Sequence, residues 1–417
     1  MTPSADPPVL DLDATSGGTV RAGAATLPLR AGHSLPSSSP TSGTAAAGGW
    51  RPVLRLGAAA EGGLSLPAAH PTASWLYAPR GVWFDDDSIV AADSGNHRLL
   101  IWHGWPTDDG APADVVLCQP DTTSEGPAAG GRGPSNGVHL PTGVTVHEGR
   151  LIVADAWHHR VLVWDHLPTA HDTPPDAVIG QVDMTSVEPN RGGEPTAMTL
   201  YWPYGIGVVA GTFWICDTGN RRVLGWHDGP PVGDDLGRPP DVVLGQEGPT
   251  RRDENRGGDV AADSFRWPHD MAGDERVLLV ADAGNHRVLG WTPAPTEDRP
   301  ADLVLGQADM TAAVEWPYGP HSADGHRFPY GISSDGATTA LADTANNRLL
   351  VFDHLPTSGG ASPVHVLAQP DFTSNGENRW DLVADDTLCW PYGLHLSGDR
   401  LAVADSGNNR VVVWGRG

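Results

Sequence analysis

The chain contains no lysine. All 26 of its basic residues are arginines, and 51 acidic residues give a formal net charge of -25. Because nucleic-acid binding normally needs a basic face, this balance argues against a DNA or RNA partner. Without lysine there is no Schiff-base chemistry and no lysine clamp for phosphate. The composition, rich in Ala, Gly, Pro and Arg, indicates GC-rich bacterial coding, with a halophilic origin as the competing explanation.

Cysteines and long apolar runs are also scarce. Cys118, Cys216 and Cys389 are odd in number and widely spaced, which does not suit a disulfide framework. No apolar run is long enough to span a membrane. The N-terminus lacks the basic and then continuously apolar regions of a secretory signal. We therefore expect an acidic cytoplasmic protein, monomeric and without a membrane partner.

One short motif recurs through most of the chain. Ala-Asp-x-x-Asn-x-Arg appears first at residues 92–98, and its Asp returns at positions 93, 155, 217, 282, 343 and 405. The successive spacings are 62, 62, 65, 61 and 62 residues. Self-similarity at a nearly fixed period identifies a repeat architecture before any residue is given a role.

Each repeat contains four short strand signals. In the second repeat these are residues 143–147, 150–154, 160–164 and 176–181, which are β-branched or apolar runs bounded by Gly, Pro, Asp and Asn. Six such repeats in a ring predict an all-β, six-bladed β-propeller. The last repeat lacks its fourth strand, and residues 51–57 resemble that strand. We expect this N-terminal strand to complete the last blade and protect the sheet edges. The predicted division is a flexible tail over residues 1–49 and a propeller over residues 50–417.

The repeats resemble NHL repeats, a family named for an Asn-His-Leu motif. Asn96-His97-Arg98-Leu99 and Asn285-His286-Arg287-Val288 carry the motif almost literally, and the resemblance covers residues 51–417. The resemblance implies a six-bladed propeller. It does not imply one activity, because NHL propellers include protein- and RNA-binding platforms and a few enzymes.

Repetition separates scaffold from candidate site residues. The Asp and Arg of the motif occur in all six repeats, so we interpret them as parts of blade construction. The residue after the Pro that opens each repeat varies instead. It is Arg80, Thr142, Tyr204, His269, Tyr330 or Tyr392. We predict that Arg80, Tyr204, His269, Tyr330 and Tyr392 surround the channel mouth as candidate catalytic residues, with an Arg–Tyr pair for electrostatic and acid–base work.

Further candidates lie on long connections that enter the blades. From the Gln after the fourth strand to the next Pro the offset is 22 residues five times, and loops this long are commonly functional or internally structured. The predicted ligand-binding residues are the Trp residues before Pro and the residues of two unusual repeats: Trp202, Trp267, Trp390, Trp157, His158, His139, Trp316 and His321. For the three Trp residues before Pro, packing of the loops is the alternative.

A metal site has little support in the sequence. Within NHL-like enzymes, peptidyl-amidoglycolate lyases bind zinc through His residues that follow Pro in different blades. Pro268-His269 is the one such pair here at the blade entrances, whereas a catalytic zinc normally has three protein ligands. Histidines 139, 158, 269, 321 and 326 could converge on one face, but the chain has 18 His. We assign no metal and leave the cofactor unknown.

Two functions remain open at this point. The first is a binding or assembly module whose aromatic top face holds a protein, peptide or small-molecule partner. The second is a lyase- or hydrolase-type enzyme with its site at the channel mouth. No Walker loop, CxxC, HExxH or G-x-S-x-G motif is present to favour a particular reaction.

Overall fold

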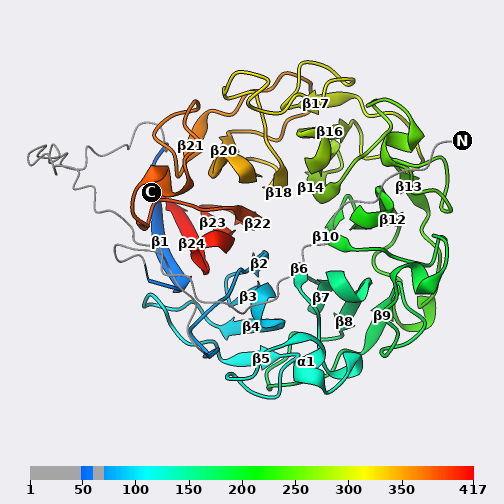
Figure 1. The fold of residues 1–417 in the computed structure, drawn as a ribbon, viewed down its shortest axis with the longest axis vertical. Coiled ribbons are helices and arrows are strands. Elements are labelled where there is room, and N and C mark those ends of the chain that lie inside the picture. The colour runs from blue at the N-terminus through cyan, green and yellow to red at the C-terminus, as the bar shows by residue number, and fades with distance from the viewer. Residues whose placement is uncertain (1–47, 60–69) are drawn as a thin grey trace, which may run out of the picture. The chain divides into compact units, whose positions relative to one another are not determined.

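The computed structural model describes residues 48–59 and 70–417. The tail predicted over residues 1–49 therefore lies almost entirely outside the described residues. The described residues form one compact unit. Within it, 24 strands form six four-stranded antiparallel sheets arranged as the blades of a propeller (Figure 1). The predicted all-β fold and the blade number are confirmed.

The first three blades follow the chain in order. The first contains β2 (Gly81–Phe84), β3 (Ser88–Asp93), β4 (Arg98–His103) and β5 (Val115–Leu117). The second contains β6 (Pro141–His147), β7 (Arg150–Asp155), β8 (Arg160–Trp164) and β9 (Ala177–Ile179). The third contains β10 (Pro203–Val209), β11 (Thr212–Asp217), β12 (Arg222–Trp226) and β13 (Val242–Leu244). In each blade the first strand lies innermost, beside the central channel (Figure 1).

The remaining blades repeat this plan. The fourth contains β14 (Pro268–Asp274), β15 (Val277–Asp282), β16 (Arg287–Trp291) and β17 (Leu303–Leu305). The fifth contains β18 (Pro329–Ser334), β19 (Thr339–Asp343), β20 (Arg348–Phe352) and β21 (His365–Leu367). The sixth contains β22 (Pro391–Ser397), β23 (Arg400–Asp405), β24 (Arg410–Arg416) and, from the N-terminal side, β1 (Trp50–Gly57).

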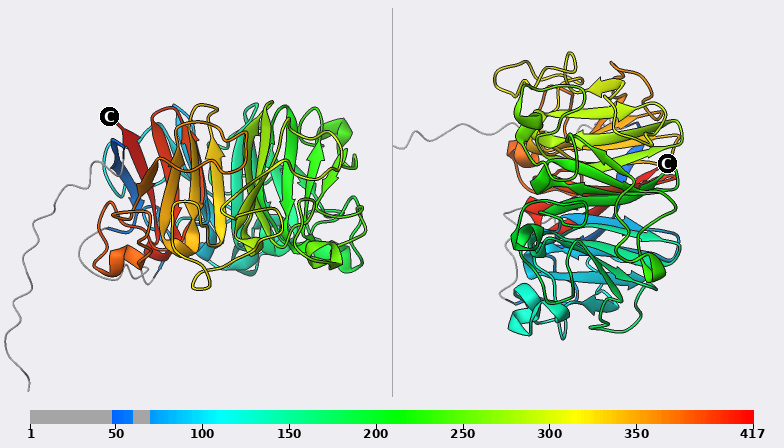
Figure 2. Two further views of the ribbon diagram at one scale, coloured as in Figure 1. Left: turned by 90° about the horizontal axis from the view of Figure 1, so that it is seen from above. Right: turned by 90° about the vertical axis from the view of Figure 1, so that its right-hand side faces the viewer.

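β1 closes the ring as the sequence predicted. It pairs antiparallel with β24, with Trp50 opposite Arg416 and Gly57 opposite Arg410. Figure 1 shows this contact as the blue strand beside the red one, and Figure 2 shows the blades from the side. Because β1 pairs with β24, the last blade has the same four strands as the others.

The core lies between adjacent blades. One cluster, for example, joins Leu99 and Ile101 of the first blade to Leu151, Val153 and Trp164 of the second, and all five are at most 2% exposed on the scale of whole residues. The central strands are apolar on both faces because a neighbouring blade covers each face. β-Branched and aromatic side chains suit this packing.

The recurrent motif builds a buried ion pair in every blade. In the third blade, Asp217 Oδ2 accepts hydrogen bonds from Arg222 Nε at 2.7 Å and Asn220 Nδ2 at 2.7 Å. Asp217 Oδ1 accepts the backbone N–H of Tyr201 at 2.7 Å. The Arg222 fork then donates to loop carbonyls, including that of Thr199 at 2.8 Å. Asp217 and Arg222 are 0% exposed, so the pair fixes the loop on the blade and has no access to a ligand.

The turn after each second strand also links neighbouring blades. A 3-10 turn occupies the x-x-Asn part of the motif: η1 (Ser94–Asn96), η3 (Ala156–His158), η5 (Thr218–Asn220), η8 (Ala283–Asn285), η9 (Thr344–Asn346) and η11 (Ser406–Asn408). The next residue is left-handed, and in the first blade it is His97. Its Nδ1 accepts the backbone N–H of Leu140 in the second blade at 3.1 Å.

The long connections have shared internal structure, as their equal lengths indicated. Most carry a short 3-10 turn or single helical turn: α1 (Pro127–Gly131), η2 (Pro134–Asn136), η4 (Pro189–Gly192), η7 (Glu254–Gly257) and η10 (Glu377–Trp380). A further turn, η6 (Gly233–Asp235), lies within the third blade. The motif Asn220 donates from Nδ2 to Oδ1 of the loop Asn190 at 2.9 Å, and Asn285–Asn255 and Asn408–Asn378 repeat the contact. These loops are anchored to the scaffold.

Candidate functional site

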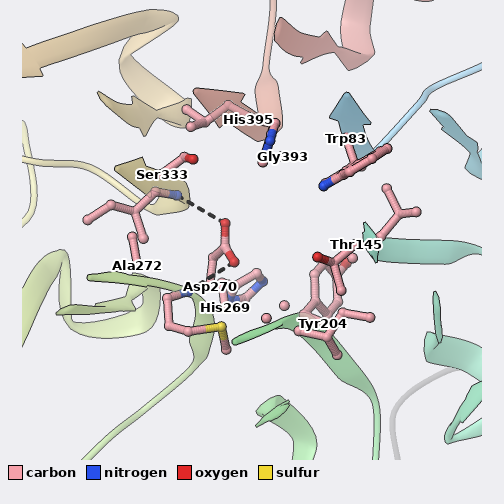
Figure 3. A pocket seen from close by; sticks show the side chains of 18 of the residues that line it. Trp83, Thr145, Tyr204, His269, Asp270, Ala272, Ser333, Gly393 and His395 are labelled. Carbon is pink, nitrogen blue, oxygen red and sulfur yellow. Dashed lines mark hydrogen bonds between the residues drawn. The ribbon is translucent and has the colours of Figure 1, made fainter. Parts of the chain in front are cut away.

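A cavity of about 180 Å³ lies in the central channel, lined by the innermost strand of all six blades. Two layers of side chains surround it. The upper layer comes from the residue after the opening Pro of each blade, and the lower layer comes from the residue three positions later. The lower layer contains Trp83, Thr145, Gly207, Ala272, Ser333 and His395. Figure 3 shows residues from both layers.

The five predicted catalytic side chains come together in the upper layer. The ring of Tyr204 contacts that of His269, with centroids 4.4 Å apart, and His269 stacks on Tyr330 at 4.3 Å. Tyr330 lies 4.9 Å from Tyr392. Arg80 closes the circle, with its guanidinium 5.1 Å from the centre of the Tyr392 ring and its Nη1 donating to Tyr204 Oη at 2.9 Å. Their catalytic role stays a prediction.

Arg80 reaches Tyr204 because the intervening blade has a small residue. Thr142 occupies the equivalent position in the second blade, and its hydroxyl donates to backbone carbonyls of the third blade. The long arginine side chain therefore passes over this position. Among the described residues, Arg80 has no carboxylate partner, and its Nε–H is buried without a hydrogen-bond acceptor.

The other groups of the upper layer are neutral near pH 7. Burial, together with the smaller effect of the Arg80 charge, lowers the pKa of His269 to about 4. His269 Nδ1 lies 3.0 Å from the Trp267 carbonyl, which can only accept, so Nδ1 carries the proton and Nε2 keeps a lone pair. Burial raises the pKa of Tyr204, Tyr330 and Tyr392. Arg80 is thus the charged group of this layer.

A sixth candidate residue, Asp270, was missed from the sequence. It follows His269 on β14, at a strand position between those of the two layers, and its side chain points into the cavity (Figure 3). Oδ2 accepts the backbone N–H of Ile332 at 3.0 Å, and Oδ1 accepts that of Met271 at 2.9 Å. No Arg or His of the described residues pairs with it. Burial therefore raises the pKa of Asp270 to about 7.

The signal for Asp270 was present in the repeat. The other five blades have Gly at this position (Gly81, Gly143, Gly205, Gly331 and Gly393), and Asp270 is the one departure. A Cβ on these glycines would meet a backbone oxygen of the next blade, at 2.4 Å for both Gly143 and Gly331. An aspartate here therefore needs a local change of backbone.

The backbone differs at the entrance to the fourth blade, and the residue responsible lies in the turn of the third blade. At the left-handed position of the turn, the third blade has Arg221 where the others have His or Asn, and an arginine side chain has no acceptor atom for the backbone N–H of Trp267. Trp267 N–H instead donates to Asp282 at 3.3 Å. Its counterparts in the other blades, such as Trp202 and Phe328, have φ near +50 to +60°, whereas Trp267 does not. The backbone just before β14 therefore has a different conformation from that before the first strand of the other blades.

Four of the predicted ligand-binding residues form a cluster beside the channel mouth. His139 contacts Trp157 at 5.4 Å and His158 at 5.6 Å between ring centroids. Trp157 contacts Trp202 at 6.1 Å, and Trp202 contacts Tyr204 at 5.8 Å. Trp157 is 46% exposed. A line of aromatic contacts therefore connects a solvent-exposed Trp to the cavity.

His158 has a scaffold contact within this cluster. It takes the place of the motif Asn, and its Nδ1 lies 2.9 Å from Asp155 Oδ2, as the Asn side chains do in other blades. His158 is 6% exposed. The structure therefore places His158 among the Asp155–Arg160 scaffold contacts and leaves little of it for a ligand.

The remaining predicted residues lie in separate groups. Trp267 stacks on Phe328 at 6.2 Å, and Trp390 Nε1 donates to Glu377 at 3.0 Å. Trp316 contacts His321 at 5.3 Å, and His321 Nε2 lies 3.1 Å from Asn375 Nδ2. Over residues 48–59 and 70–417, no three His, Cys, Asp or Glu side chains gather as a potential metal site. No helix in the same ranges is long and apolar enough to cross a membrane.

Comparison with known proteins supports the repeat class. The NHL repeat model matches residues 139–164, which hold the second blade's inner strands and motif. The chain is thus a six-bladed β-propeller containing an NHL repeat. No curated protein matches the chain.

Similar solved structures are distant. Virginiamycin B lyase from Staphylococcus aureus is 10% identical, over 83% of this chain and 97% of that chain, with a TM-score of 0.40. A protein of unknown function from Bacteroides thetaiotaomicron is 12% identical, over 88% and 75%, with a TM-score of 0.45. Likenesses at this level carry no argument about activity.

Proposed function

We propose that the protein is a binding module that holds a carboxylate-bearing ligand at the mouth of its central channel. The carrying observation is Arg80, whose guanidinium lies at the mouth without a carboxylate partner. An arginine fork matches a carboxylate in shape and charge, and a bidentate pair is among the stronger hydrogen-bonded contacts. The protein supplies the cation and leaves the anion to the ligand.

The surroundings of Arg80 suit such a ligand. The aromatic rings of Tyr204, Tyr330 and Tyr392 and the edge of His269 provide a partly apolar wall with polar tips. Ligand pockets commonly combine apolar walls with few oriented polar groups. The exposed Trp157 and the adjacent Trp202 extend this wall onto the top face, where a larger partner would gain contact area.

Titration with small carboxylates tests this proposal. The probes are acetate, butyrate and benzoate, followed by calorimetry or by NMR of the ligand signals. We expect binding to the wild-type protein and a loss of about tenfold or more in affinity for Arg80→Met, because a charge-assisted pair is removed. If no carboxylate binds, or if Arg80→Met binds equally well, the proposal is wrong.

An enzyme of the lyase or hydrolase type is the second candidate. His269 favours it, because a neutral imidazole with Nδ1 fixed by a carbonyl leaves Nε2 as a base, and a neutral Tyr is next to it. Arg80 would stabilise developing negative charge. Turnover by the wild-type protein that His269→Ala abolishes while carboxylate binding persists would support catalysis over binding alone.

A further inference from the structure

The cavity contains two opposite charges that the protein leaves uncompensated. Arg80 belongs to the first blade and Asp270 to the fourth, so in a ring of six they lie on opposite walls of the channel. Both line the same cavity. The two side chains form no ion pair with each other, and neither pairs with another charged side chain of the described residues.

Each group keeps unused hydrogen-bonding capacity. The carboxylate of Asp270 accepts one N–H at each oxygen, whereas a carboxylate offers about four acceptor sites. The guanidinium of Arg80 has five N–H donors and uses one, toward Tyr204. Buried charges left in this state are costly unless a partner completes them.

The lower layer adds polar groups that face the same space. Trp83 Nε1 and the Thr145 hydroxyl have no hydrogen-bond partner among the described residues, and Figure 3 shows both around the cavity with the Asp270 carboxyl group. Trp83 and His395 also offer ring faces, with centroids 5.9 Å apart. Aromatic faces and a carboxylate together are a typical environment for an organic cation.

We propose that the channel binds a small molecule that carries both a carboxylate and an ammonium group, with Arg80 holding the carboxylate and Asp270 the ammonium. The Arg80 half rests on the function proposed above. The Asp270 half is independent of it and specifies the ligand class. Such a ligand pairs with the charges of Arg80 and Asp270 at the same time, whereas a simple acid or a simple amine pairs with one of them.

The proposal has a pH consequence. The titratable groups around Asp270 are His269 beside it, Tyr204 on β10, Tyr330 on β18, Tyr392 and His395 on β22, Arg80 before β2, and the buried Cys216 on β11, whose pKa burial and Asp270 raise. Burial lowers the pKa of His395 to about 4, and the tyrosines and His269 are neutral as described. Asp270, with a pKa of about 7, is the group of this cavity that titrates near neutrality, and its ionised form binds the ammonium.

The test uses the full chain and a ligand series that varies one spacing. The probes are ω-amino acids from glycine to 6-aminohexanoate, each with the alkanoate and the alkylamine of the same length, titrated by calorimetry at pH 8 and pH 6. One length should bind about tenfold or more tightly than its alkanoate. Its affinity should fall about tenfold at pH 6, where the Asp270 carboxyl is mostly protonated.

Two variants separate the two proposals. Asp270→Gly restores the residue of the other five blades, so we expect it to fold, and it should bind the amino acid no better than the alkanoate. Asp234→Gly removes an exposed acid elsewhere and should change nothing. If the wild type binds alkanoate and amino acid equally, the ammonium site is wrong and the carboxylate site stands. If neither binds, both are wrong. Unchanged amino-acid selectivity in Asp270→Gly also overturns the inference.

Discussion

The six motif ion pairs and the two channel charges use the same residue types in opposite ways. In each motif an Asp and an Arg lie in direct contact, both fully buried, with every Asp oxygen hydrogen-bonded. In the channel, Arg80 and Asp270 have no charged partner within the part of the chain that the structure describes. The difference shows that charge type does not identify a site here. What distinguishes the site is charge that the fold leaves unpaired.

The largest expected effect comes from breaking a motif pair. Arg222→Met leaves the buried Asp217 without its cation and loop carbonyls without a donor, so we expect the free energy of unfolding to fall by about 3 to 5 kcal/mol. The matched variant Arg80→Met removes one hydrogen bond and one cation–π contact, and should stay within about 1 kcal/mol of the wild type. Denaturant unfolding measures both. Equal losses would erase the distinction between scaffold and site.

A second prediction concerns the pH dependence of stability. The folded-state pKa of Asp270 is raised to about 7 from 3.8, so the folded protein binds the extra proton between these values. Stability is therefore lost as pH rises from about 4 to 7. Relative to Asp270→Asn, whose side chain does not titrate, the wild type should lose roughly 2 to 4 kcal/mol over this window.

Unfolding curves of the two proteins at pH 4.5, 6 and 8 measure this difference. Buried histidines with lowered pKa values, such as His97 and His159, also reduce stability in acid. This loss is the same in both proteins and cancels when their free energies of unfolding are compared. A difference that stays constant with pH would mean that Asp270 is ionised and satisfied by the scaffold, like Asp217.

The smallest effect tests His158, which lies in the aromatic cluster but contacts the scaffold. His158→Ala removes a hydrogen bond to the buried Asp155 and should cost about 1 to 2 kcal/mol. His158→Asn restores the residue that other blades have and should stay within about 0.5 kcal/mol. Thermal or denaturant unfolding reads both. If Asn were as destabilising as Ala, His158 would have a role that the motif does not explain.

The sequence predicted the scaffold almost completely, because each scaffold feature is repeated. The period located the blades, and the recurrence of the motif Asp and Arg in all six repeats indicated parts of blade construction, which fits their buried ion pairs. The closing strand β1 followed from one missing strand in the last repeat. The sequence also predicted which side chains surround the channel mouth, since they all occupy one position of the repeat: Arg80, Tyr204, His269, Tyr330 and Tyr392.

The rest depended on contacts that no spacing reveals. Asp270 was overlooked although it departs from five glycines, because the sequence does not show that no cationic side chain of the described residues pairs with it. His158 stood out as a departure, yet its Nδ1 reproduces the Asn contact with Asp155. The reach of Arg80 over Thr142 to Tyr204 depends on three-dimensional distance between blades.

The most direct test of unpaired charge as the mark of the site is a crystal structure of the wild-type protein soaked with the tightest-binding ω-amino acid. We predict density in the central channel, with the carboxylate on the Arg80 guanidinium and the ammonium group within hydrogen-bond distance of the Asp270 carboxyl oxygens. Density for the ligand elsewhere on the propeller, with both side chains contacting water alone, would contradict the account.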